Sequence, residues 1–258
     1  MRNDPPGLLG GVWAVTVRNL HVWRSVAFAS IAGNFGEPIL YLLAMGFGLG
    51  RVVPQLGGMS YAEFIAPGLV VSTVMYTATF EMTYGSYTRL STQGVFEAIL
   101  ATPVSVEELT AGELVWGGLK SLMSGSAVLI VVTAFGLVPS PFALALPLLA
   151  FVAGVLFASM ALGVTSISAS YEFFNYYFTL VVAPMFLFSG IFFPLDQMPG
   201  WVHVFAQILP LTHVVVVSRG LVRGTLDAHV WIHLAALLAF TALFATLCML
   251  GMRRRLRQ

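Results

Sequence analysis

Six long apolar segments, separated by short polar or turn-rich stretches, are the feature that most constrains the fold of this chain. A helix of about 20 apolar residues is long enough to cross the hydrocarbon core of a bilayer. Only 9% of the residues are charged, whereas soluble domains carry about 25%. The sequence therefore predicts an all-α integral membrane protein with six transmembrane helices, over residues 26–49, 63–84, 109–138, 142–169, 173–193 and 230–252.

The composition also excludes several classes of protein. A net charge of +1 leaves no basic surface of the kind that binds nucleic acid. Cys248 is the lone cysteine, so no disulfide framework can form. No short apolar region with a cleavage site precedes the first span, which we expect to be retained. We expect residues 1–258 to form a single transmembrane domain.

The segment before the first span, residues 8–25, has an amphipathic pattern. Its apolar residues recur at three- and four-residue steps, while Arg18 and His21 fall on the opposite side. The segment also contains two tryptophans and two arginines, which suit a membrane surface. We predict an interfacial helix here, and the alternative is the frayed start of the first span.

Two apolar runs between residues 184 and 219 are interrupted by prolines. A turn-rich break at 194–200 separates the runs, and Pro210 divides the second. Proline removes a helical hydrogen bond and disfavours helix at the residue before it. Broken backbone at membrane depth is tolerated only where protein or water covers it. We therefore predict a re-entrant hairpin over residues 199–219.

A few charged residues fall within the predicted spans. Glu37, followed by Pro38, lies in the middle of the first span, where a carboxylate is costly. It either lines a pathway or packs against protein at a Pro38 kink. Glu81, Arg89 and Lys120 lie near span ends, so we expect them to extend toward the membrane surface.

The loop between the second and third spans contains a short helix. Ser91 or Thr92 can cap a helix that ends before Pro103, and a capping box at Ser105 and Glu108 starts the next helix. This short helix either lies on lipid or docks a soluble partner. We expect it to display the apolar side chains Val95, Phe96, Ile99 and Leu100.

Arginine placement predicts the orientation. Six spans put both termini on one side, where eight arginines then lie, while Arg51, Arg219 and Arg223 lie on the other side. Basic residues are enriched in cytoplasmic loops. We therefore predict that both termini are cytoplasmic.

The sequence lacks motifs for catalysis or metal binding. His229 and His233 stand one helical turn apart, but no third ligand lies near them in the sequence. The segment 112–121 approaches a P-loop, yet Gly118 occupies the lysine position. We predict that this chain holds no metal or cofactor, binds no ATP and is not an enzyme.

Several motifs together resemble the type-2 ABC exporter permeases. The strongest is Pro210-Leu-x-His213-x5-Arg219, preceded by SGIFFPLDQMP at 189–199. Further segments, at 37–42, 94–105 and 173–178, extend the likeness over nearly the whole chain to the nodulation-factor, lipo-oligosaccharide (J-type) branch of that family. The resemblance implies a homodimer of permeases with two separate ATPase subunits that bind ATP and Mg. It implies that residues 91–104 are a coupling helix whose contact residues are Val95, Phe96, Glu97, Ile99, Leu100 and Pro103.

The resemblance also implies a function. It indicates ATP-driven export of an amphipathic substrate (a lipo-oligosaccharide, lipid-linked saccharide or drug-like molecule) by alternating access in the bacterial inner membrane. Pro210, His213 and Arg219 then shape the extracellular closure or contact substrate, and we favour the first role. The alternatives are an ion-driven secondary carrier and a non-transporting scaffold or sensor subunit.

Overall fold

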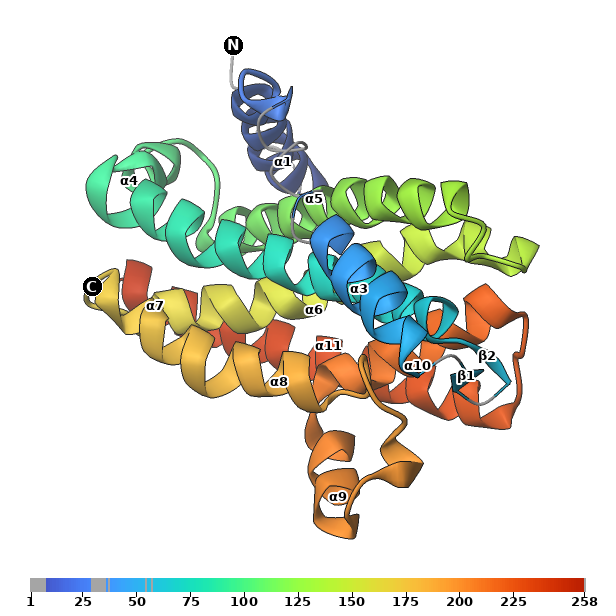
Figure 1. Cartoon of the computed structure of the whole chain (residues 1–258). Coiled ribbons are helices and arrows are strands. Elements are labelled where there is room, and N and C mark those ends of the chain that lie inside the picture. Colours follow the sequence, from blue (N-terminus) through green and yellow to red (C-terminus); the bar gives the residue numbers. More distant parts are fainter. Residues whose placement is uncertain (1–7, 29–35, 37, 54, 57, 258) are drawn as a thin grey trace.

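Figure 1 shows the computed structural model of the chain, in which most helices run alongside one another between two ends. The structure describes residues 8–28, 36, 38–53, 55–56 and 58–257. Glu37, predicted to lie within the first span, falls outside the described residues.

The described residues are largely helical. The α-helices are α1 (Leu8–Arg24), α3 (Tyr61–Phe80), α4 (Val95–Leu100), α5 (Val106–Ala134), α6 (Leu146–Ile167), α7 (Glu172–Tyr177), α8 (Ala183–Phe188), α9 (Gly200–Ile208), α10 (Pro210–Arg223) and α11 (Ala228–Leu256). Tighter or wider helical turns are η1 (Leu42–Gly48), η2 (Leu49–Arg51), η3 (Glu81–Gly85), η4 (Thr88–Thr92), η5 (Pro141–Ala145), η6 (Phe178–Val182) and η7 (Leu195–Gln197). Two short strands, β1 (Gln55–Leu56) and β2 (Met59–Ser60), pair antiparallel.

Among the described residues, four helical runs are long and apolar enough to cross a membrane: Tyr61–Thr92, Val106–Ala134, Pro141–Ile167 and Ala228–Leu256. They correspond to four of the six predicted spans. The runs Pro38–Arg51 and Glu172–Phe188, at the places of the other two, are shorter. The chain is thus a helical protein with several candidate spans.

Side-chain caps explain where two of the long helices begin. The Ser60 hydroxyl accepts from the backbone N–H of Glu63, whose carboxylate accepts from Ser60 in return. The same reciprocal pair joins Ser105 and Glu108 at the start of α5. Such a box satisfies backbone donors that the first turn leaves free. The capping box predicted at Ser105 is confirmed.

The core is formed where α6 packs against α3, α5 and α11. Close approach depends on small residues, because a Cβ added at Gly154 would lie 2.5 Å from the Cβ of Ser121 on α5. Small residues on both helices therefore allow this close contact.

Helix α1 ends at Arg24 and lies on α5 (Figure 1). Its buried face contains Val15, Thr16 and Asn19. Leu9 and Trp13 are exposed, at 83% and 66% of their surface. This helix therefore uses one face for packing and leaves an apolar face uncovered within the chain.

Helices α9 and α10 form a bent pair. They meet at 92°, and the joint is Leu209, whose backbone is extended. Pro210 then occupies the first position of α10, where its missing N–H costs no helical bond. The break predicted at Pro210 is confirmed.

Candidate functional site

The short helix α4 lies at one end of the bundle, between the long run Tyr61–Thr92 and α5 (Figure 1). Its N-cap is Gly94, at φ 61°, a left-handed conformation that suits glycine. The prediction that Ser91 or Thr92 caps α4 is wrong, because the π-helical turn η4 carries the preceding helix through Thr92. The Ser91 hydroxyl instead donates to the carbonyl of Tyr87.

Helix α4 presents a different face from the one expected. Phe96 is fully buried, so the prediction that it is displayed is wrong. The turn at Gly94 folds α4 back so that Phe96 enters the core, with Val95, Ile99 and Leu100 partly buried around it. Glu97 and Pro103 remain exposed. The coupling role of these residues stays a prediction.

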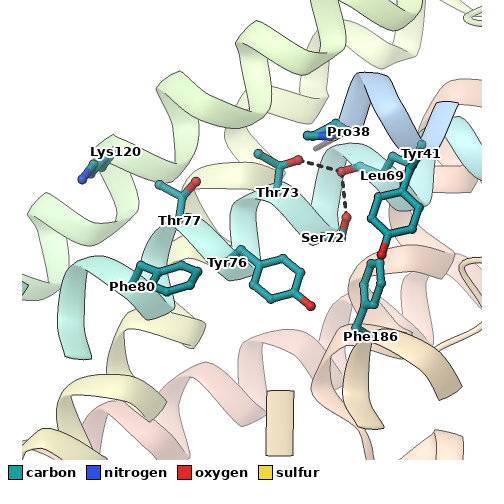
Figure 2. A pocket seen from close by; sticks show the side chains of 10 residues that line it. All are labelled: Pro38, Tyr41, Leu69, Ser72, Thr73, Tyr76, Thr77, Phe80, Lys120 and Phe186. Carbon is teal, nitrogen blue, oxygen red and sulfur yellow. Dashed lines mark hydrogen bonds between the residues drawn. The ribbon is translucent and has the colours of Figure 1, made fainter. Parts of the chain in front are cut away.

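A cavity of about 260 Å³ opens between α3, α8 and the helical run Pro38–Arg51 (Figure 2). We call it the aromatic–hydroxyl cavity. Its lining residues are Pro38, Tyr41, Leu69, Ser72, Thr73, Tyr76, Thr77, Phe80, Lys120 and Phe186. Of the two residues predicted in the first span, Pro38 is buried and lines this cavity, whereas Glu37 is not described.

Aromatic rings and hydroxyl groups make up much of the lining of this cavity. The Ser72 and Thr73 hydroxyls donate to the Leu69 carbonyl, over 2.9 and 3.0 Å (Figure 2). The rings of Tyr41 and Tyr76 both pack edge-on against Phe186, at centroid distances of 5.7 and 5.6 Å. Apolar walls with a few polar groups are typical of small-molecule sites. The arrangement suits an amphipathic ligand with a hydroxylated part.

Next to this cavity, four charged side chains form a buried ion cluster: Glu81, Arg89, Glu113 and Lys120. Arg89 donates to Glu81 over 2.9 Å and to Glu113 over 2.7 Å, and Lys120 donates to Glu81 over 2.6 Å. The expectation that Glu81, Arg89 and Lys120 extend to the membrane surface is wrong. Packing of α3 on α5 places opposite charges together, so they pair inside the bundle instead.

Neighbouring polar groups complete the ion cluster. Glu113 is 1% exposed and also accepts from Asn19 over 2.7 Å and from Ser86 over 2.8 Å. The Trp116 indole donates to Glu81 over 3.0 Å. These bonds join α1, the end of the α3 run and α5. In the sequence, Glu81, Arg89 and Lys120 appear as three separate charges in apolar segments. Their opposite signs were the one indication that they could pair with one another.

The motif residue Arg219 holds α10 against two other segments. Its guanidinium donates to the carbonyls of Phe64 and Gly190, over 3.3 and 3.0 Å. It also lies 4.0 Å from the centroid of the Phe64 ring, within cation–π range. The carbonyl of Phe64 belongs to α3, and Gly190 follows α8. Arg219 therefore ties the bent pair to the bundle.

Three histidines form a hydrogen-bonded chain at the same end. His213 Nδ1 lies 2.8 Å from His233 Nδ1, and His233 Nε2 lies 3.2 Å from His229 Nε2. The other nitrogen of His213 lies 3.1 Å from the Gln207 carbonyl. No third ligand lies near His229 and His233 in the sequence, and the packing of α10 on α11 brings His213 to them in space. Among the described residues, no cluster has a geometry that would hold a metal ion.

Comparisons with known proteins show the family of this chain. The ABC-2 type transporter family matches residues 11–222. The chain is similar to Nodulation protein J of Rhizobium meliloti (strain 1021), with 38% identity over 94% of this chain and 93% of that protein. Nodulation protein J of Rhizobium leguminosarum bv. trifolii is 36% identical over 98% of this chain and 96% of its own length. The Inner membrane transport permease YadH of Escherichia coli (strain K12) is 24% identical over 93% and 92%. The predicted resemblance is confirmed, and this chain belongs to the ABC-2 type transporter family, as a membrane permease similar to the nodulation J proteins.

Proposed function

We propose that this chain is the permease subunit of an ATP-driven exporter, and that its α4 helix receives the motion of a separate ATPase subunit. The observation that carries the coupling is the structure of α4. It is six residues long, far too short to span, and it connects two long helical runs. Phe96 fixes it to the core while Glu97 remains exposed. A rigidly held helix with an exposed face suits transmission of force.

The ion cluster can transmit that motion from α4 into the bundle. Glu81 and Arg89 lie at the end of the run that leads to α4, and Glu113 lies on α5, which follows α4. A displacement of α4 therefore acts on two long helices that buried charges hold together. ATP and Mg would be bound by the ATPase, and this chain contributes no catalytic group.

The aromatic–hydroxyl cavity supports an amphipathic substrate such as a lipo-oligosaccharide. Aromatic faces pack against sugar rings and acyl chains, while hydroxyls bond to sugar hydroxyls. We propose outward movement by alternating access, in a homodimer with two ATPases in the bacterial inner membrane. Both termini are cytoplasmic, α1 is interfacial, six segments span, and α9 with α10 is re-entrant from the outer side.

Co-purification with a candidate ATPase subunit tests the proposal. Glu97→Arg reverses an exposed charge on α4 and should lower the recovered ATPase and the ATP-dependent export at least fivefold. Asp196→Arg is the matched control, because Asp196 is also exposed but belongs to η7 before the bent pair. Equal recovery in both variants and the wild type would remove the coupling role of α4.

Phe96→Ala tests how α4 is held. Removing a fully buried ring costs about 3 kcal/mol or more where the site cannot collapse. We expect weaker recovery of ATPase with α4 more open to protease, while the long helices still insert. Transport by the purified permease without ATPase would support the secondary carrier instead, and absence of any ATPase partner would support the scaffold.

A further inference from the structure

A second cavity, of about 430 Å³, lies on the other side of the ion cluster, between α1, the η3–η4 turns and α5. We call it the ion-cluster cavity. Lys120 lines both this cavity and the aromatic–hydroxyl cavity. The other residues of its wall that matter here are Arg18, Trp23, Glu81, Arg89 and Trp116.

The charges in and behind this wall do not balance. Arg18, Arg89 and Lys120 are cations, whereas Glu81 in the wall and Glu113 behind it are the anions. Arg18 has no carboxylate partner among the described ion pairs; its guanidinium donates to the Asn19 side chain over 2.8 Å. Burial and the Arg89 charge lower the pKa of the Arg18 guanidinium, while the Glu113 carboxylate raises it. The formal excess is one positive charge.

The hydrogen-bonding capacity is unbalanced in the same direction. Glu81 already accepts from Arg89, Trp116 and Lys120, so about three of its four lone-pair sites are used. Donors remain in excess. The Trp23 Nε1 and Arg89 Nε atoms are buried and find no acceptor within the described residues. The Lys120 ammonium has three donors, and its bond to Glu81 uses one of them.

We propose that the ion-cluster cavity binds a multi-oxygen anion of the phosphate class, as found in the head group of an anionic lipid. Such a group supplies both the missing negative charge and several acceptors. The indole of Trp23, which packs edge-on against that of Trp116 at a centroid distance of 6.2 Å, lies in the same wall and would meet the apolar part of such a lipid. The inference deepens the proposed function, since it gives an anionic amphipathic substrate a first contact beside the aromatic–hydroxyl cavity.

The test uses the purified, delipidated full chain without any ATPase, so that its result is independent of coupling and transport. Native mass spectrometry measures the first binding event of phosphatidylglycerol, with phosphatidylcholine and inorganic phosphate as separate arms. We expect phosphatidylglycerol to bind at least tenfold more tightly than phosphatidylcholine. Retention of inorganic phosphate with equal affinity would identify free phosphate as the ligand and remove the lipid from the proposal.

Two arginines on α1 provide the matched variants. Arg18→Gln removes the wall charge and should weaken the first phosphatidylglycerol at least tenfold, and Arg18→Lys should restore most of the affinity. Arg24→Gln removes an exposed charge outside the wall. It should change the affinity for the first phosphatidylglycerol less than twofold. An unchanged melting temperature shows that the variants fold. Equal affinity in Arg18→Gln and Arg24→Gln, or no preference for phosphatidylglycerol, would overturn the proposal.

Discussion

The two ends of the bundle stabilise buried polar groups in opposite ways. At the end that carries α4, full charges of both signs meet, and Arg89 lies between Glu81 and Glu113. At the end that carries α10, the buried cation Arg219 has two carbonyls and an aromatic face as its partners. The same end also contains the hydrogen-bonded imidazoles of His229, His233 and His213.

The difference has a physical consequence. Charge pairs in a low-dielectric site are individually strong and leave a large penalty when one partner is removed. Carbonyls and rings hold a cation more weakly, and each link can be replaced by another dipole. The α4 end should therefore move as a rigid unit, whereas the α10 end can open and close at smaller cost. A transporter that is driven from one end would benefit from this division.

The largest expected effect comes from removing a carboxylate of the ion cluster. Glu113→Gln leaves Arg89 with a single counter-charge in a buried site, so we expect a loss of about 3 kcal/mol. The measurement is thermal unfolding in detergent micelles. Glu97→Gln is the control, because Glu97 is exposed on α4 and should change stability by less than about 0.5 kcal/mol. Equal melting temperatures would show that the cluster is not rigid.

Arg219 gives the next largest effect. Arg219→Met removes two charge-assisted bonds and the contact with Phe64, which should cost about 2 kcal/mol. Arg219→Lys should not restore it fully, because an ammonium lacks the planar guanidinium that packs on the Phe64 ring. Arg223→Met, at an exposed position of the same helix, should be neutral. Protease cleavage near the 194–200 break measures release of the bent pair, and unchanged cleavage in Arg219→Met would contradict the tying role.

A smaller effect is expected in the histidine chain. His213→Phe removes the 2.8 Å bond to His233 and the bond to the Gln207 carbonyl, so we expect a loss of about 1–2 kcal/mol. His229→Phe should lose less, because His229 is exposed and ends the chain. Thermal unfolding again provides the measurement. A larger loss in His229→Phe would reverse the order of importance proposed for the chain.

The smallest effects compare matching caps at the two ends. Ser105→Ala and Ser60→Ala each break a capping box and should cost about 1 kcal/mol. Ser105→Ala should cost more, since Glu108 is 5% exposed and loses the hydroxyl donor of Ser105 in a buried site. Circular dichroism during heating measures both. A larger loss in Ser60→Ala would mean that the α10 end is the more rigid one.

Much of the fold follows from the sequence by itself. Length and apolar composition determine the long helices, and local chemistry determines where several begin, as at Ser105 and Pro210. The family also follows, since the Pro210 to Arg219 motif depends on residue types at fixed spacing. These features are local, so no distant contact is needed to predict them.

Only the tertiary structure decided how distant polar groups meet. By local rules Ser91 and Thr92 could cap a helix, but both residues belong to the π-helical turn that continues the preceding helix. Phe96 is buried because a left-handed glycine reverses the chain, and His213 meets His233 because α10 lies on α11. The ion cluster depends on how far α3 and α5 are shifted along each other when they pack. The positions of the separate charges in the sequence do not predict that shift. Spacing along one helix specifies a face, whereas a site needs the register between helices.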